Sequence, residues 1–402
     1  MCGMQSKNSR LSIGVFGSFY PHLNRLSTVN TGLVSLLAID RRVGRVMVYA
    51  PMGSRLPPGI GQSAVEVRSV WNYDDPVSMI RTWLEMLAAS SRTDAFVFNI
   101  FLTSFGKSKV ANAFGLVIPV LVGLTSRVTT ITYMHNFLET QRVEELGYNP
   151  SWLARFLVSQ LERLIGLTTQ LVAPISSQAT IVEATLRVDC KPCFIPYLEA
   201  LPLESIGVVG PAAVRTRSTG RRTVLLFGAW GPQKDIAGSA RVLAEVMRRN
   251  TTIDVVIAGS INESFPEYGR KLRDSLADLP SNRVQIQLNL PQIQVGQLFQ
   301  SADVVLLPYM ASGGYSGVMS VAALLDVPLV SYDHPQLRES AAELGARVTF
   351  VRSGDVEGFA QAVLAAVSAD SQASDTLSLR MGERIEVARS AVGRLIDLMT
   401  RT

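Results

Sequence analysis

Short runs of apolar residues recur along the whole chain, and each run ends at a polar or glycine-containing turn. The runs are rich in β-branched residues and lack strict alternation, which is typical of strands buried on both faces of a parallel sheet. In the first half, the predicted strands cover residues 12–16, 45–50, 95–100, 128–134 and 170–173. In the second half, they cover residues 223–227, 254–258, 284–287, 303–307, 329–331 and 348–351.

Helical patterns lie between the predicted strands. The clearest covers residues 151–167 and carries one apolar face, made of Leu153, Phe156, Leu157, Leu161 and Leu164. Further helices are predicted at residues 237–249, 356–367 and 379–399. Strands that alternate with helices predict α/β domains with parallel sheets.

The periodicity stops between residues 201 and 222, where five prolines and glycines indicate a linker. A chain of 402 residues also favours two domains. We therefore predict two doubly wound, Rossmann-like α/β domains that face each other across an interdomain cleft. The expected divisions are an N-terminal domain at 1–205, a linker at 206–222, a C-terminal domain at 223–378, and a helix at 379–402 that packs back towards the N-terminal domain.

Composition restricts the partners. Apolar residues make up 47% of the chain and charged residues 18%, so two cores can be filled. The net charge of +5 is compatible with anionic substrates or with an anionic membrane surface. The basic pairs Arg41-Arg42 and Arg221-Arg222 form no stripe with interleaved aromatic residues, so nucleic acid is not an expected partner.

No targeting or membrane-spanning segment is expected. Residues 1–10 lack a secretory apolar core, and the longest apolar run, 114–124, is shorter than the roughly 20 residues that a span requires. We expect a cytoplasmic protein, with peripheral binding to the inner face of a membrane as a hypothesis. Cys190 and Cys193 form a lone CxxC pair, which we interpret as incidental, with a redox or metal-binding role as the alternative.

Two strand ends in the second half favour an anion. The strand at 223–227 runs into Gly228 and then Lys234, just before a helical pattern. The strand at 303–307 leads into a glycine- and serine-rich loop that ends at Ser316-Gly317 before another helix. Glycine lets the backbone approach an anion, while lysine and helix N-termini supply positive charge. Because ligands bind at the carboxyl ends of parallel strands, we predict a phosphate site here, with ordinary loop structure as the alternative.

Two strand ends in the first half complete the predicted site. The first strand leads into Gly17-Ser18, whose backbone could approach a phosphate or an acceptor, and the fourth ends in Met134-His135-Asn136. The three histidines are far apart and no Asp-x-Asp triplet occurs, so no metal site is expected. The economical interpretation is a diphosphate-bearing ligand that the second domain holds against the first.

Taken together, these segments resemble the family 4 retaining glycosyltransferases, a group 1 family with the two-domain GT-B fold. The resemblance covers about residues 12–367. It is carried by the order and spacing of Gly17-Ser18-Phe19-Tyr20-Pro21, Met134-His135-Asn136, Phe227-Gly228 with Lys234, and Ser316-Gly317 followed by residues 322–323 and 327–330.

The resemblance implies transfer of a hexose-type sugar from a nucleotide-diphosphate donor to a glycan or lipid-linked acceptor, with retention and without a metal or cofactor, in polysaccharide biosynthesis. It implies a catalytic role for His135 and Lys234. The implied donor-binding residues are Gly17, Ser18, Gly228, Lys234, Tyr315, Ser316 and Gly317. The implied acceptor-side residues, in the N-terminal domain, are Tyr20, Asn30 and Asn136.

The chain departs from the family pattern at three positions. Ala229 stands where an arginine is frequent, and Gly313 and Val321 stand where two glutamates are frequent. A non-catalytic relative that binds sugar or nucleotide, and a nucleotide-sugar epimerase, are therefore alternative interpretations. The segments 114–124 and 151–167, with Lys107, Lys109, Arg155 and Arg163 nearby, are interpreted either as core helices or as a surface that approaches a membrane.

Overall fold

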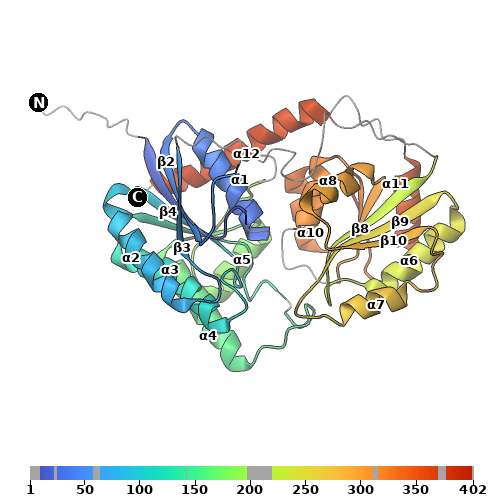
Figure 1. Ribbon diagram of the computed structural model, residues 1–402, viewed down its shortest axis with the longest axis horizontal. Coiled ribbons are helices and arrows are strands. Elements are labelled where there is room, and N and C mark those ends of the chain that lie inside the picture. The colour runs from blue at the N-terminus through green and yellow to red at the C-terminus, as the bar shows by residue number, and fades with distance from the viewer. Residues whose placement is uncertain are drawn as a thin grey trace, which may run out of the picture. The chain divides into compact units, whose positions relative to one another are not determined.

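The computed structural model describes residues 10–21, 25–57, 64–141, 143–196, 220–310, 316–369 and 377–400. It divides into two compact units (Figure 1). The first unit comprises Met1–Thr140, Trp152–Ala200 and Ile385–Thr402, and the second comprises Gln141–Ser151 and Leu201–Arg384. The last helix, α12 (Leu377–Thr400), thus contributes its C-terminal part to the first unit.

The first unit is built on a seven-stranded parallel sheet with the order β3-β2-β1-β4-β5-β6-β7. Its strands are β1 (Leu11–Phe16), β2 (Val43–Pro51), β3 (Val65–Trp71), β4 (Ala95–Ile100), β5 (Thr129–Met134), β6 (Gln170–Ala173) and β7 (Cys190–Pro192). Its helices are α1 (Arg25–Ile39), α2 (Pro76–Ala89), the short η1 (Ser90–Arg92), α3 (Lys109–Thr125), α4 (Trp152–Thr168) and α5 (Ser176–Leu186). Helices α2, α3 and α4 lie in a row beside the sheet (Figure 1).

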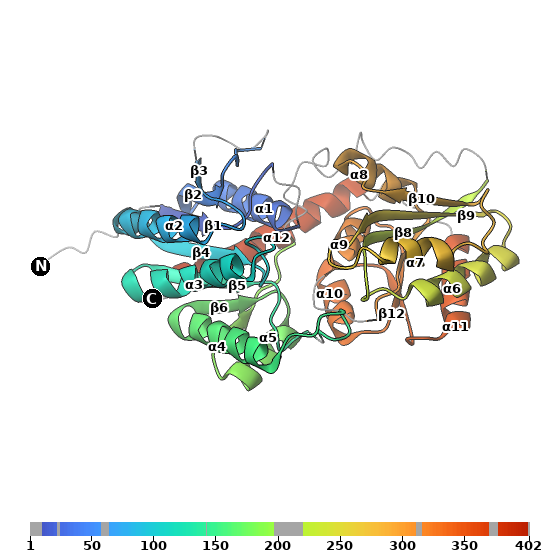
Figure 2. The same ribbon diagram turned by 60° about the horizontal axis from the view of Figure 1, so that its bottom comes forward.

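The second unit is built on a six-stranded parallel sheet with the order β10-β9-β8-β11-β12-β13. Its strands are β8 (Arg222–Trp230), β9 (Ile253–Ile261), β10 (Val284–Leu288), β11 (Val304–Leu307), β12 (Leu329–Tyr332) and β13 (Val348–Val351). Its helices are α6 (Ile236–Arg249), α7 (Tyr268–Ser275), α8 (Gln292–Ser301), α9 (Gly317–Leu324), α10 (Pro335–Leu344) and α11 (Val356–Ser368). Figure 2 shows α6 and α11 side by side.

Both sheets have the strand order of a Rossmann domain, in which the order reverses next to the first strand. The reversal lies between β1 and β4 in the first unit and between β8 and β11 in the second. The prediction of two doubly wound α/β domains is confirmed. Two strands were not predicted, because β3 lies at a sheet edge with mostly half-buried residues and β7 has only three residues.

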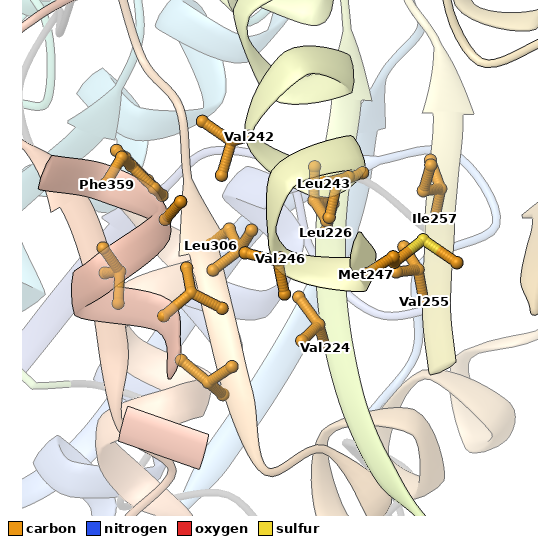
Figure 3. Close-up of a cluster of buried hydrophobic side chains, with 14 of the residues drawn as sticks. Val224, Leu226, Val242, Leu243, Val246, Met247, Val255, Ile257, Leu306 and Phe359 are labelled. Atoms are coloured by element: carbon orange, nitrogen blue, oxygen red, sulfur yellow. The ribbon is translucent and has the colours of Figure 1, made fainter. Parts of the chain in front are cut away.

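A single apolar core explains why α6 packs on the second sheet. Val242 and Val246 lie on one side of this helix, one turn apart, and belong to a buried cluster with Leu226 of β8 and Leu306 of β11 (Figure 3). Phe359 of α11 is 2% exposed and closes the same cluster, with its ring 5.0 Å from that of Tyr332. The side chain of Asp235 accepts a hydrogen bond from the Gly238 amide at 2.7 Å, which fixes where α6 begins.

Helix α4 of the first unit buries a carboxyl group rather than its apolar face. Glu162 is 1% exposed, and its Oε1 accepts a hydrogen bond from the Leu138 amide at 2.8 Å. No partner for its Oε2 lies within the described residues. Burial raises the pKa of Glu162 to about 8, and the charge of Glu139 adds to this shift. The neutral acid therefore anchors the loop that follows β5.

We expect Phe359→Ala to destabilise the second unit by about 3–5 kcal/mol, because it removes a fully buried ring and leaves a cavity. Urea unfolding followed by tryptophan fluorescence measures the change. Ile286→Ala in β10 is the control, since Ile286 is 39% exposed and its truncation is expected to cost less than about 1 kcal/mol. Equal unfolding midpoints for the two variants would contradict the assigned core.

We expect Glu162→Gln to stabilise the protein increasingly as the pH rises from about 4.5 to 8. Below the ordinary pKa of 4.5 the carboxyl is neutral in both states. Above it the unfolded chain ionises first, so the wild type loses stability until the folded pKa is reached, by up to about 4–5 kcal/mol. Glutamine keeps the acceptor for the Leu138 amide and cannot ionise.

Denaturant unfolding of both proteins across this pH range measures the difference. Glu183→Gln is the matched control, because the exposed Glu183 also accepts one backbone hydrogen bond, from Cys190 at 3.2 Å. This control is expected to follow the wild type. A constant difference between wild type and Glu162→Gln at all pH values would refute the assignment of a neutral Glu162.

Candidate functional site

The loop after β1 in the first unit approaches two other chain segments very closely. Gly17 has φ of +152°, and an added Cβ would collide with Asn30 of α1 and would lie 2.8 Å from the carbonyl oxygen of Asn99. The side-chain amide of Asn30 donates to the Ser18 carbonyl at 2.8 Å, and the Ser18 hydroxyl bonds to Tyr73. Only glycine fits this position, because any side chain would separate the ends of β1 and β4.

His135 lies at the end of the neighbouring strand β5 and is 5% exposed. Its Nε2 donates to Asn99 Oδ1 at 2.6 Å, and its ring stacks on Phe101 with centroids 4.7 Å apart. Asn99 therefore fixes the tautomer and the orientation of the imidazole while its own carbonyl borders Gly17. The predicted residues Gly17, Ser18, Asn30 and His135 thus converge around Asn99, which the sequence reasoning missed.

The two other residues assigned to the acceptor side have different surroundings. Tyr20 is half-buried, its carbonyl accepts from the Arg55 amide at 2.8 Å, and the Arg55 guanidinium lies 5.8 Å from its ring centroid. Asn136 is half-buried and its Oδ1 accepts from the Leu102 amide at 2.9 Å. Asn136 thereby joins the loop after β5 to the loop after β4. Glu162 supports the same loop through Leu138.

In the second unit, Lys234 folds back over the end of β8. Its Nζ donates to the carbonyl oxygen of Phe227 at 2.6 Å and lies 4.3 Å from the centroid of the Trp230 ring. Lys234 is 5% exposed, and burial lowers its pKa to about 7. No carboxylate pairs with this ammonium within the described part of the chain. Its nearest partners are thus the Trp230 ring, in a cation–π contact, and the carbonyl oxygen of Phe227.

Gly228 leaves the space that Lys234 occupies. It has φ of +124°, and an added Cβ would lie 2.7 Å from Lys234 Nζ and 3.4 Å from Val318 Cγ2 in the first turn of α9. The loops after β8 and β11 are also joined, because Lys234 and Tyr309 form an antiparallel bridge and the Met310 amide donates to Gln233 at 2.9 Å. The lysine loop and the start of α9 therefore lie together.

Helix α9 begins where the sequence predicted an anion-binding turn. Ser316 is the N-cap residue, its Oγ accepts from the Met319 amide at 3.3 Å, and the Tyr309 hydroxyl lies 3.4 Å from that oxygen. Gly317 is the first helical residue. A helix N-terminus carries partial positive charge, so it adds to the field of Lys234. Tyr315 and Gly313 lie outside the described residues, and the half-buried Val321 offers no carboxylate on α9.

The two cysteines of the CxxC pair are free thiols and both are buried in the first unit. Burial raises the pKa of Cys190 to about 12, and the thiol of Cys193 donates to the Ala391 carbonyl on α12 at 3.6 Å. Among the residues that the structure describes, no cluster of three or more His, Cys, Asp or Glu could hold a metal ion. None of the described helices combines the length and the apolar character of a membrane span.

Known proteins resemble the chain in two ways. Residues 221–369 match the family model described as glycosyl transferases group 1. The crystal structure of Anabaena HepE in complex with UDP and glucose aligns with a TM-score of 0.66 at 13% identity, over 98% of this chain and 100% of that one.

Two further solved structures share the fold. The UDP-forming α,α-trehalose-phosphate synthase of Burkholderia xenovorans has a TM-score of 0.62 at 12% identity, over 98% of this chain and 99% of that one. A glycosyltransferase of Rickettsia africae has a TM-score of 0.61 at 11% identity, over 98% and 96%. No curated protein matches the sequence. The β8–α11 region thus matches the group 1 glycosyltransferases, and the whole chain shares its fold of two Rossmann-like domains with solved structures of glycosyltransferases.

Proposed function

We propose that the protein is a retaining glycosyltransferase that moves a sugar from a nucleotide-diphosphate donor to a glycan or lipid-linked acceptor. The observation that carries the proposal is the buried, carboxylate-free ammonium of Lys234 beside the N-terminus of α9. A buried cation without a carboxylate partner is unfavourable unless an anion completes its surroundings. The family match over residues 221–369 supports a glycosyl donor as the source of that anion.

In this proposal, Lys234 stabilises the charge that develops on the leaving diphosphate. The amides at the start of α9 and the glycine turn at Gly228 supply the remaining positive field. UDP is the first nucleotide to test, because HepE was crystallised with UDP and the Burkholderia synthase is UDP-forming. This electrostatic role does not require a metal, and the absence of an Asp-x-Asp triplet supports metal independence.

Trp230 offers a reason why the loop works without the arginine that is frequent at position 229. The indole face lies 4.3 Å from Lys234 Nζ, and the indole Nε1 donates to the Ala258 carbonyl at 3.1 Å, which holds the ring in place. The ammonium is therefore positioned before any ligand binds. Positioning of this kind lowers the reorganisation that the site undergoes on reaction.

The first unit is proposed to receive the acceptor and the donor sugar. His135, oriented by Asn99, is assigned to a sugar hydroxyl, and Gly17 with Ser18 is assigned to the donor side. Tyr20, Asn30 and Asn136 are assigned to the acceptor. The reaction is proposed to belong to polysaccharide biosynthesis in the cytoplasm.

One observation favours a second candidate function. Val321 on α9 stands where a glutamate frequently holds the donor ribose, so a nucleotide-sugar-binding protein without transferase activity is the alternative. A panel of nucleotide sugars, assayed for donor hydrolysis, separates the two. Release of nucleoside diphosphate from any donor would support the enzyme, whereas binding without turnover would support the alternative.

We expect Lys234→Ala to weaken UDP binding by about tenfold to a hundredfold, because one charge-assisted contact to the diphosphate is lost. Calorimetric titration with UDP measures the effect. Lys271→Ala is a matched control, since Lys271 also lies 4.3 Å from an aromatic centroid, that of Tyr268, but sits exposed on α7. Equal UDP affinity for Lys234→Ala and wild type would reject the assigned role.

We also expect UDP binding to take up a proton above about pH 7. Burial holds the pKa of Lys234 near 7 in the free protein, so the amine is mostly neutral at higher pH. A bound diphosphate favours the ammonium and raises this pKa. Affinity should therefore fall by up to about tenfold per pH unit between roughly pH 7.5 and 9.

Titrations in buffers with different ionisation enthalpies count the protons taken up. Lys234→Met is the comparison, because it keeps the apolar stem of the side chain and removes the titrating amine. Its affinity is expected to be lower and independent of pH over this range. Proton uptake that persists in Lys234→Met would assign the titration to another group and refute this prediction.

A further inference from the structure

Helix α4 exposes most of its large apolar side chains and buries Glu162 beside Ile165. Its first residue, Trp152, is 78% exposed, and five other large apolar side chains are between 47% and 62% exposed: Leu153, Phe156, Leu157, Leu164 and Leu167. The only residues that it buries are Glu162 and Ile165. The expectation that residues 151–167 form a core helix is therefore wrong for most of their apolar face.

The exposed side chains form one continuous side of the helix. At 3.6 residues per turn, Trp152, Phe156, Leu164 and Leu167 fall within about 120° of one another, and Leu153 and Leu157 lie on the same side. The helix α3, which packs against α4, also exposes Val110, Phe114 and Leu124, at 57%, 41% and 68%. We refer to these nine residues as the α3–α4 apolar face.

The exposed charges on α3 and α4 themselves have one sign. Lys109, Arg155 and Arg163 are the basic residues of α3 and α4, and Lys109 and Arg163 are exposed. The single acid of the two helices, Glu162, is buried and bonded to the Leu138 amide. The face thus combines exposed aromatic and aliphatic side chains with positive charge and carries no exposed carboxylate on either helix.

We propose that the α3–α4 apolar face docks on an anionic lipid surface. An interfacial helix inserts its apolar side among acyl chains while flanking Lys and Arg residues contact anionic headgroups, and tryptophan is favoured at that boundary. A second copy of this chain fits less well, because a two-fold contact pairs the same patch of both copies and so brings two positively charged surfaces together.

This inference rests on the proposed function in one respect, since it selects the lipid-linked acceptor over a soluble glycan. The surface itself is independent of that choice. Docking through α4 would hold the loop after β5, which Glu162 anchors and which carries His135, at the membrane where a lipid-linked acceptor lies.

Co-sedimentation with vesicles tests the surface directly. The probe is a vesicle of equal parts phosphatidylglycerol and phosphatidylcholine at low salt, compared with pure phosphatidylcholine. The wild type is expected to bind the anionic vesicles, and Phe156→Glu with Leu164→Glu is expected to weaken binding by about tenfold or more. The control, Ile39→Glu with Val387→Glu, alters residues that are 57% and 50% exposed on α1 and α12.

A second pair of variants tests the charge. Lys109→Glu with Arg163→Glu should weaken binding to anionic vesicles by about tenfold or more, since each basic residue near the surface contributes a few-fold. The control is Arg41→Glu with Arg394→Glu, which reverses the charge of two exposed residues in the loop after α1 and in α12. It therefore matches the change in net charge away from the face.

Three results would overturn the proposal. They are no binding of wild type to anionic vesicles, equal losses in the test and control pairs, and a concentration-dependent dimer that Phe156→Glu with Leu164→Glu abolishes. Circular dichroism and UDP titration of each variant verify folding. Wild type that binds vesicles without binding UDP would reject the proposed function and leave the lipid surface standing, so the two failures are distinguishable.

Discussion

Both units depend on one constraint, which is that an all-parallel sheet covered by helices buries both of its faces. Most residues inside each strand must then be apolar, and side chains that meet a ligand are placed where strands end. The residues assigned to function follow this rule, since Gly17, His135 and Lys234 all come just after a strand. Within its own unit, Gly17 follows β1 and Lys234 follows β8, the strands next to which the order reverses and where open α/β sheets bind ligands. His135 follows β5, the neighbour of β4.

The same constraint explains how much the sequence could predict. Gly17, Gly228 and the lysine loop were predicted from apolar runs that end in glycine, because this pattern can be recognised in the sequence without knowing the fold. Asn99 and Tyr309 were not predicted, since their roles arise from residues that follow other strands and are far away in sequence. Trp230 was not predicted because its contact with Lys234 depends on how that side chain folds back over β8. Asn99 did leave a trace, as the only polar residue in the apolar run of β4.

Helix α4 shows what hydrophobic periodicity can and cannot predict. The pattern correctly predicted a helix with an apolar face, but periodicity alone does not state which face the protein buries. The side that faces the interior carries Glu162, whose carboxyl meets the Leu138 amide, and Ile165, which belongs to the core. A polar residue opposite an apolar face ordinarily indicates solvent, and here it indicates the interior.

Lys234 and Glu162 are both buried ionisable side chains whose pKa values are shifted by burial. Each is an ionisable group that the fold keeps from solvent, and burial moves both pKa values towards neutrality from opposite directions. Glu162 as a neutral acid carries no charge that needs a partner, and a backbone amide already bonds to its Oε1. Lys234 has an aromatic face and one carbonyl, which hold an ammonium but do not neutralise it. Of the two, Lys234 therefore gains more from a ligand, and the ligand that completes its surroundings is an anion.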